Sequence, residues 1–203
     1  MARVLLLTGE HADGVRFRSG DHRVLGALQQ LDDEWMIAVK PALGDLHPDF
    51  VALHPQFGVC AIRVCDWTVG AFRQAADGMI EVRGTTGWYP TGESPRWDAL
   101  QLRNRIFDEH FIATGTQIAD DTIVRGIVVL PKYTTDEACN LLRRPQMVSA
   151  EHWIDVWGGH EFGLHTACAL TGDPRMRPKV VPTEAFEQFV GTLEFDPSLV
   201  TTG

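Results

Sequence analysis

An acidic residue and a hairpin pattern meet in one short stretch of this chain. Asp49 opens an apolar run, residues 54–58 (HPQFG) form a turn, and a second apolar run leads back to Cys65. Pairing back from the turn brings Asp49 close to residues 63–65, and Arg63 and Cys65 share one strand face because side chains alternate. A carboxylate placed in this way is suited to bind Mg²⁺ for hydrolysis of a phosphodiester.

The two residues that should complete such a site have the wrong chemistry. A guanidinium cannot bind Mg²⁺, so we expect Arg63 to replace the metal and to hold Asp49 in a fixed ion pair. Cys65 is expected to be a buried, inert thiol. The alternative is a cysteine nucleophile whose pKa is lowered by Arg63, although no histidine is clearly placed as its base.

Further segments extend this pattern in both directions. In chain order they are Gly20-Asp21 with HRVLGALQQL, EWMIAVKP, Asp49-Phe50, His54-Pro55 with Gly58, Arg63-Val64-Cys65-Asp66-Trp67 and SPRWDALQLRNRIF. In this order and spacing, the stretch from Gly20 to about Pro131 resembles the nuclease-related domain (NERD) family. That family is a branch of the PD-(D/E)xK restriction-endonuclease-like superfamily, and it has Glu-Val-Lys-Asp-Trp where this chain has residues 63–67.

The resemblance implies which positions form the site. Asp49, Arg63, Cys65 and Gln101 would be equivalent to the family's catalytic residues, with Arg63 and Cys65 substituted. Asp49 and Asp21 would be the ligands of any metal, and Asp21 would replace a glutamate that is one methylene longer. Two of these residues also have structural interpretations: Asp21 suits the first turn of a helix, and Gln101 suits a polar helix face.

The function that follows from the resemblance is that of a catalytically degenerate nuclease-like domain. It would act in nucleic-acid binding or in the assembly of a DNA-processing or defence complex, and whether any enzyme activity remains is left open. No cofactor is expected, and Mg²⁺ would bind only to an active site. One alternative is an active Mg²⁺-dependent DNA endonuclease with a relocated carboxylate, Glu81, and another is a purely structural protein-interaction module.

Composition limits the partners. The chain has 203 residues and a formal net charge of -9, which argues against a protein that coats nucleic acid, since phosphate binding relies on Lys and Arg. Local basic clusters remain, and they are either binding sites or scattered solvated charge: Arg16/Arg18/Arg23, Arg103/Arg105, Arg143/Arg144 and Arg175/Arg177/Lys179. DNA, bound weakly, is therefore one expected partner, and the resemblance implies a helicase or other protein module as another.

Hydropathy and cysteine usage indicate the compartment. No run approaches the roughly 18 apolar residues of a transmembrane helix, and no signal peptide is expected. The four cysteines contain no CxxC pair, and Cys60 and Cys65 should lie on opposite faces of one strand. Reduced thiols and a cytoplasmic location, away from membranes, are therefore expected.

The order of elements predicts an α/β fold. We expect a restriction-endonuclease-like mixed sheet flanked by helices, formed by residues 1–145, with a small helical C-terminal extension, residues 146–203, packed on the same body. Strands are predicted at residues 4–8, 35–40, 49–54, 59–65, 78–83 and 123–130. Helices are predicted at residues 21–31, 94–112, 149–157 and around 164–170, and from residues 134 and 183 onward.

Overall fold

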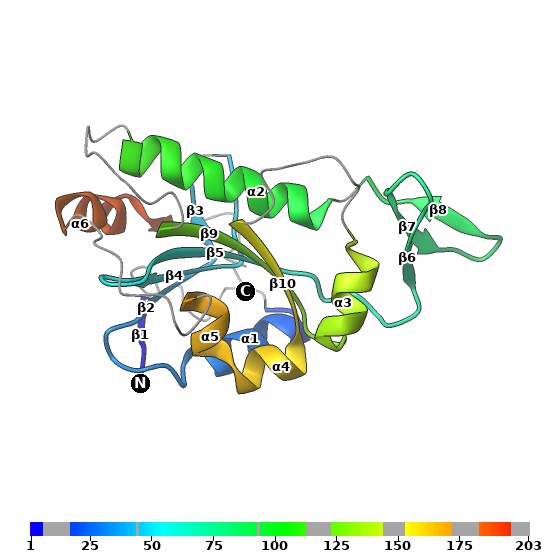
Figure 1. Cartoon of the computed structure of the whole chain (residues 1–203), viewed down its shortest axis with the longest axis horizontal. Coiled ribbons are helices and arrows are strands. Elements are labelled where there is room, and N and C mark those ends of the chain that lie inside the picture. The colour runs from blue at the N-terminus through cyan, green and yellow to red at the C-terminus, as the bar shows by residue number, and fades with distance from the viewer. Residues whose placement is uncertain are drawn as a thin grey trace, which may run out of the picture.

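A six-stranded mixed sheet forms the centre of the computed structural model (Figure 1). The structure describes residues 1–5, 17–43, 45–92, 94–112, 123–143, 153–171 and 183–195. The strands of this sheet, in spatial order, are β1 (Arg3–Leu5), β2 (Met36–Val39), β4 (Phe50–His54), β5 (Gly58–Val64), β9 (Val124–Leu130) and β10 (Ile154–Gly158). Strand β4 pairs antiparallel with β2 and with β5, whereas the pairs β1–β2, β5–β9 and β9–β10 are parallel.

The hairpin predicted around residues 49–65 is confirmed. Phe50 lies opposite Ile62 and His54 lies opposite Gly58, so the chain reverses within three residues. Gly58 has a φ of +87°, and a Cβ at this position would lie 2.0 Å from the carbonyl oxygen of Ile123. Only glycine satisfies both constraints, and this fixes the register that brings Asp49 to the end of β5.

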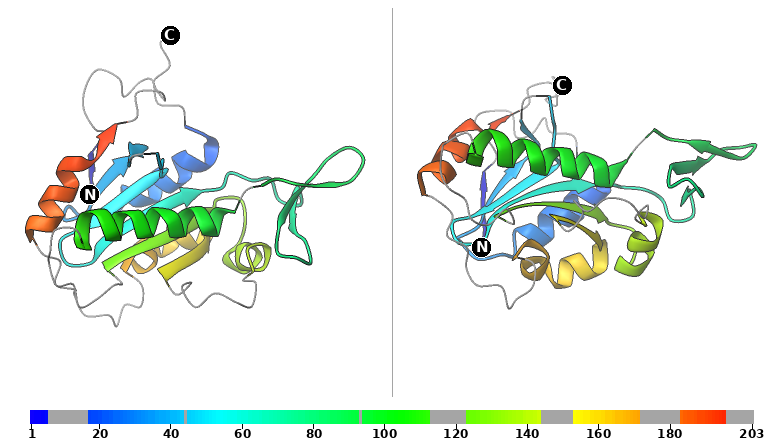
Figure 2. Two further views of the ribbon diagram at one scale, coloured as in Figure 1. Left: turned by 90° about the horizontal axis from the view of Figure 1, so that it is seen from above. Right: turned by 45° about the horizontal axis from the view of Figure 1, so that its top comes forward.

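Helices cover both faces of the sheet, as the sequence predicts (Figures 1 and 2). On one face lie α1 (Ser19–Leu28), α4 (Gly159–Leu164) and α5 (Thr166–Thr171). On the other lie α2 (Pro95–Ile106), the π-helical segment η2 (Phe107–Ile112) and α6 (Thr183–Thr192). A short helix, α3 (Thr135–Leu141), packs beside β10 and begins with Thr134, whose side chain caps it.

Successive residues of β5 supply opposite cores, which explains why both faces need helices. Ile62 packs with Leu28 of α1 and Phe162 of α4, whereas Ala61 packs with Ile106 of α2. This alternation also separates the cysteines, since Cys60 and Cys65 are buried in different clusters. All four cysteines are free thiols, in agreement with the expectation of reduced cysteines.

A second, three-stranded antiparallel sheet projects from one end of the body (Figure 2). It consists of β6 (Phe72–Gln74), β7 (Ile80–Arg83) and β8 (Trp88–Pro90). The rings of Trp67 and Phe72 stack 4.2 Å apart at its base. The strand predicted at residues 78–83 is therefore present as β7, but it lies outside the main sheet. A further two-stranded pair joins β3 (Pro41–Ala42) to β11 (Glu194–Phe195).

The C-terminal part differs from the prediction of a helical extension. The helix predicted over residues 149–157 is wrong, because residues 154–158 form β10, which pairs in parallel with β9. Ile154, Val156 and Gly158 are buried, and the residues between them are half-buried, which is the period-two pattern of an edge strand. The described part of residues 146–203 thus supplies a strand to the same sheet as residues 1–145.

Two details of the helices bear on the site and its surroundings. Arg18 occupies the N-cap position of α1, and Ser19 is the first residue of the helix. Trp97 of α2 is 56% exposed.

Candidate functional site

Asp49 lies directly before β4 and is buried. Its Oδ2 accepts a hydrogen bond from the backbone N–H of Val64 at 2.7 Å. Its Oδ1 lies 2.6 Å from Nζ of Lys40 and 2.9 Å from Nη2 of Arg18. The hairpin register thus delivers this carboxylate to the end of β5, as the sequence predicts, and two cations meet it there.

Asp21 reaches the same point from α1, and its side chain is fully buried. Its Oδ2 lies 3.0 Å from Nζ of Lys40, and its Oδ1 lies 3.0 Å from Nη2 of Arg18. Burial raises the pKa of this carboxyl group, but hydrogen bonds from Arg18 and Lys40 outweigh burial and hold the pKa below its ordinary value. The two carboxylates that the sequence singles out, 28 positions apart, therefore share one ammonium and one guanidinium.

Lys40 is the residue that sequence reasoning missed. It follows β2, its side chain is 10% exposed, and it has a φ of +48°. This left-handed conformation is uncommon for a residue with a side chain and indicates a locally constrained backbone. The available signal was a lysine at the end of an apolar strand immediately before Pro41, since lysine is rarely buried without a carboxylate partner.

Arg18 was noted only as part of a basic cluster. It is the N-cap of α1, and its backbone N–H donates to Oδ2 of Asp21 at 3.0 Å. Its Nη2 also donates to the carbonyl oxygen of Val64 at 3.1 Å. Arg18 therefore links the start of α1 to the end of β5, and its side chain remains 47% exposed.

Arg63 pairs with Asp49 as predicted, but as the weakest of three cationic partners. Its Nη1 lies 3.8 Å from Oδ2 of Asp49 and donates to the carbonyl oxygen of His47 at 3.4 Å. Its side chain is 38% exposed, and its charge also acts on Asp98 of α2. Lys40 and Arg18 therefore contact Asp49 more closely than Arg63 does.

The other predicted site residues lie apart from this cluster of Arg18, Asp21, Lys40, Asp49 and Arg63, which we call the charge cluster. Cys65 is buried beyond the end of β5, close enough to Arg18 for electrostatic interaction. Gln101 lies half-buried on α2, and no hydrogen bond joins it to the described residues of the cluster. Glu81 lies on β7 of the projecting sheet, where its carboxylate is 2.7 Å from Nε of Arg73.

The charge cluster does not fit a divalent metal ion. A metal bound by Asp21 and Asp49 would occupy the position where the ammonium of Lys40 already contacts both carboxylates. The guanidinium of Arg18 contacts the same two carboxylates, so two positive charges already balance the two negative charges. Mg²⁺ also needs several oxygen ligands or waters at about 2.0–2.1 Å, which two nitrogen cations exclude.

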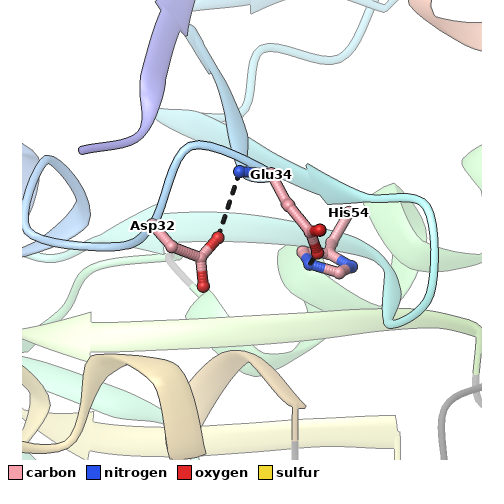
Figure 3. Close-up of side chains that lie close together, drawn as sticks. All are labelled: Asp32, Glu34 and His54. Atoms are coloured by element: carbon pink, nitrogen blue, oxygen red, sulfur yellow. Dashed lines mark hydrogen bonds and ion pairs between the residues drawn. The ribbon is translucent and has the colours of Figure 1, made fainter.

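A second group of potential ligands consists of Asp32, Glu34 and His54 (Figure 3). Nε2 of His54 lies 3.2 Å from Glu34, and Nδ1 of His54 accepts the backbone N–H of Gln56 at 3.0 Å. In neutral histidine an accepting Nδ1 requires the proton to be on Nε2, which then donates to Glu34. The nitrogen that faces the carboxylates is therefore a donor, and this arrangement is not that of a metal ligand.

Comparison with models of protein families, with curated proteins and with solved structures finds no match to this chain. Within the described residues, no helix is both long enough and apolar enough to cross a membrane. Any proposal about function must therefore come from the site itself.

Proposed function

We propose that this chain is a nuclease-like domain that no longer cleaves and that acts by binding nucleic acid within a DNA-processing or defence complex. The observation that carries the proposal is the shared contact of Lys40 Nζ with Asp21 and Asp49, at 3.0 and 2.6 Å. Two carboxylates converge where the NERD resemblance places metal ligands, and a lysine neutralises them. A site of this kind retains the scaffold of a nuclease without its metal chemistry.

The order of elements supports a restriction-endonuclease-like arrangement. The resemblance places a helix first, then a strand, then the Asp49 strand, the strand that ends at residues 63–65, and the Gln101 helix. The described chain has α1, β2, β4, β5 and α2 in this order. Asp49 and Arg63 also meet at one end of the β4–β5 pair, as a site formed from these positions requires, whereas Cys65 is buried beyond the end of β5.

Partly exposed guanidinium groups at the charge cluster favour nucleic acid as a partner. The side chains of Arg18 and Arg63 are 47% and 38% exposed, so part of each cation faces solvent. Guanidinium donors suit phosphate oxygens, and Arg18 Nη1 has no hydrogen-bond partner among the described residues. The overall charge of -9 makes weak, salt-sensitive binding the expected behaviour.

The alternative of an active nuclease that uses Glu81 gains no support from the geometry. Glu81 is held by Arg73 on a sheet that projects from the body (Figure 1), while Asp49 is buried at the end of the hairpin. The alternative of an interaction module has one favourable observation. Large apolar side chains are exposed on or near the projecting sheet, namely Val69, Met79, Tyr89 and Trp97.

Two assays on the purified chain test the proposal. Fluorescence anisotropy at low salt should detect weak binding of single- or double-stranded DNA, and Arg63→Gln should weaken it. Arg3→Gln is the matched control, since Arg3 is exposed at the start of β1, away from the charge cluster. Gel assays with Mg²⁺ or Mn²⁺ should show no cleavage, and cleavage abolished by Asp49→Ala would contradict the proposal. Absence of DNA binding would favour the interaction module.

A further inference from the structure

A cavity of about 650 Å³ opens beside the charge cluster, at the carboxyl ends of the parallel strands β9 and β10. It lies between α1 and α4, which pack side by side beneath the sheet (Figure 1), and it is closed at one end by the loop that leads into α3. Its volume is within the roughly 300–1,000 Å³ of ligand sites. Ligands in α/β sheets bind outside the carboxyl ends of strands, so the cavity has both the size and the position of a binding site.

The walls of this cavity are kept open by glycines within helices. Gly26 of α1 and Gly163 of α4 both line it, and a Cβ added at either would meet nothing within 4 Å. Glycine inside a helix is destabilising relative to alanine. A residue with a side chain would fit the backbone conformation and the packing at both positions. The feature that the two glycines share is the space that they leave open in the cavity.

The rim of the cavity is basic. Arg23 and Lys132 line it together with His22 and His160, and Glu137 is the one carboxylate among its described lining residues. The carboxylate of Glu137 already accepts hydrogen bonds from the backbone N–H and hydroxyl of Thr134, at 2.9 and 3.0 Å. Among the described lining residues, Arg23 and Lys132 therefore carry permanent positive charges, and His22 and His160 add imidazole rings. The carboxylate of Glu137 is already engaged by Thr134, the N-cap of its own helix.

Donors remain available on both cations. Arg23 uses Nη1 for the carbonyl oxygen of Pro131 at 2.8 Å, which leaves most of its five N–H groups without a partner among the described residues. Lys132 Nζ lies 3.0 Å from Oδ1 of Asp66 and 3.4 Å from its carbonyl oxygen, so one of its three protons remains for a ligand. Guanidinium and ammonium donors grouped in this way suit an anion with several oxygens.

Contacts through Asp66 link the rim of the cavity to the charge cluster. Lys132 contacts one carboxylate oxygen of Asp66, and the other accepts the hydroxyl of Ser19 at 3.0 Å, next to Arg18. The cationic side chains of Arg18, Lys132 and Arg23 therefore all lie near the start of α1, with Lys132 linked to the residue next to Arg18 through Asp66. This arrangement matches a ligand that carries more than one negative group.

We propose that this cavity binds a phosphate group, carried either by a nucleic-acid strand that also crosses the charge cluster or by a free nucleotide. This site deepens the proposed function. It depends on that function only if the phosphate belongs to a nucleic-acid strand. The cations at the rim hold the phosphate oxygens, and the glycine-lined space, beside the exposed Leu164, accommodates the attached sugar or base.

A cavity-filling variant provides the sharpest test. A Cβ at Gly26 meets nothing within 4 Å, so Gly26→Leu directs its side chain into the cavity and replaces a glycine by a better helix former; the variant should melt no lower than the wild type. Gly191→Leu is the matched control, since Gly191 lies in α6, away from the cavity, and also has open space around its Cβ position. Arg23→Gln removes one donor group and leaves the cavity open.

Pyrophosphate, ADP and a single-stranded oligothymidine are the probes, and affinity is measured by calorimetry and anisotropy. Wild type and Gly191→Leu should bind pyrophosphate and ADP. Arg23→Gln should weaken both about tenfold or more, and Gly26→Leu, which fills the space for the sugar or base, should weaken ADP about tenfold or more. Unchanged affinity in both variants, or no pyrophosphate binding by the wild type, would overturn the inference.

The probes also separate this inference from the proposed function. Loss of oligothymidine binding in Gly26→Leu supports a strand in the cavity. Binding of pyrophosphate and ADP but not of oligothymidine by the wild type supports a nucleotide site and contradicts the proposed nucleic-acid binding. Oligothymidine binding that neither variant changes supports the proposed function and overturns the cavity as its phosphate site.

Discussion

Nζ of Lys40 lies 2.6 Å from Oδ1 of Asp49, and this contact is the shortest of the charge cluster. The same ammonium lies 3.0 Å from Asp21, so one lysine bridges carboxylates from α1 and from the start of β4. Because both carboxylates are buried, their repulsion is offset by this ammonium together with the more exposed guanidinium of Arg18. Removing the cation should therefore affect the fold far more than removing an exposed partner would.

Lys40→Met tests how much the bridge stabilises the fold. Methionine retains an unbranched side chain and any backbone strain at φ +48°, so the loss of charge is the main change. Leaving two buried carboxylates without their shared ammonium should lower the free energy of unfolding by about 3–5 kcal/mol. Urea titration at neutral pH measures this value.

Arg63→Met is the matched control for the same carboxylate. Arg63 lies 3.8 Å from Asp49 and is 38% exposed, so its removal should cost about 1 kcal/mol or less. Equal losses for the two variants would show that the ammonium of Lys40 has no special role in the cluster.

The hairpin could be predicted because its information is local. The turn residues 54–58 fix the register, and the register alone carries Asp49 to the end of β5. Lys40 could not be assigned in this way, because its side chain enters the site through a left-handed backbone conformation that no periodicity signals. Arg18 likewise enters as a helix cap, a position usually filled by serine, threonine, asparagine or aspartate.

Strand β10 shows a second limit of sequence reasoning. Its residues 154–158 alternate buried and half-buried positions, but five residues are too few to separate a strand from a short helix by pattern alone. The pairing partner β9 decides the outcome, and that partner is supplied by tertiary structure. Tertiary pairing also determines where Glu81 lies. The sequence of β7 predicts a strand, but this strand pairs within the projecting sheet and not within the main sheet.

Removing Lys40 should also uncover a divalent-metal site. In Lys40→Ala, the guanidinium of Arg18 still contacts both Asp21 and Asp49, and a divalent cation in the space that the ammonium leaves can relieve the repulsion that Arg18 alone does not offset. We expect Mn²⁺ to raise the stability of this variant by about 2.7 kcal/mol when present at about 100 times its dissociation constant. The wild type should show no such gain, and calorimetric melts with Mn²⁺ or with chelator measure the difference.

The family residues can be restored on the same background. Arg63→Glu with Cys65→Lys should give little metal response while Lys40 is present, because the ammonium still occupies the shared position. Adding Lys40→Ala to this pair should restore the response. If the pair alone binds Mn²⁺ as well as the triple variant does, Lys40 does not block the site.

Acid should weaken the charge cluster through Asp21. Burial raises the pKa of this carboxyl group, but Arg18 and Lys40 more than offset burial, so its folded-state pKa lies below the unfolded value of about 3.9. The stability that it contributes is therefore complete above about pH 4 and is lost as the pH falls through the lowered pKa. Urea titrations from pH 7 to pH 2 should show a shallower acid loss in Asp21→Asn than in the wild type. An identical slope in both proteins would contradict this assignment.

His54 should produce a separate loss of stability at mildly acidic pH. Burial lowers its pKa, and the nearby carboxylates of Glu34 and Asp32 only partly oppose burial. Because the folded-state pKa lies below the unfolded value of about 6.5, the contribution of His54 is complete above about pH 6.5. It is lost as the pH falls through the lowered pKa, since a protonated Nδ1 can no longer accept the N–H of Gln56.

His54→Phe isolates this effect, because a phenyl ring can still pack between Trp35 and Phe57, whose rings lie 4.8 and 4.6 Å from that of His54. The variant should lose the pH dependence that begins below about pH 6.5, while the acid loss below about pH 4 remains. Nuclear magnetic resonance of the wild-type ring at neutral pH should show the proton on Nε2, and added Zn²⁺ should leave this resonance unchanged. A proton found on Nδ1, together with a Zn²⁺-dependent shift, would instead make Asp32, Glu34 and His54 a metal site.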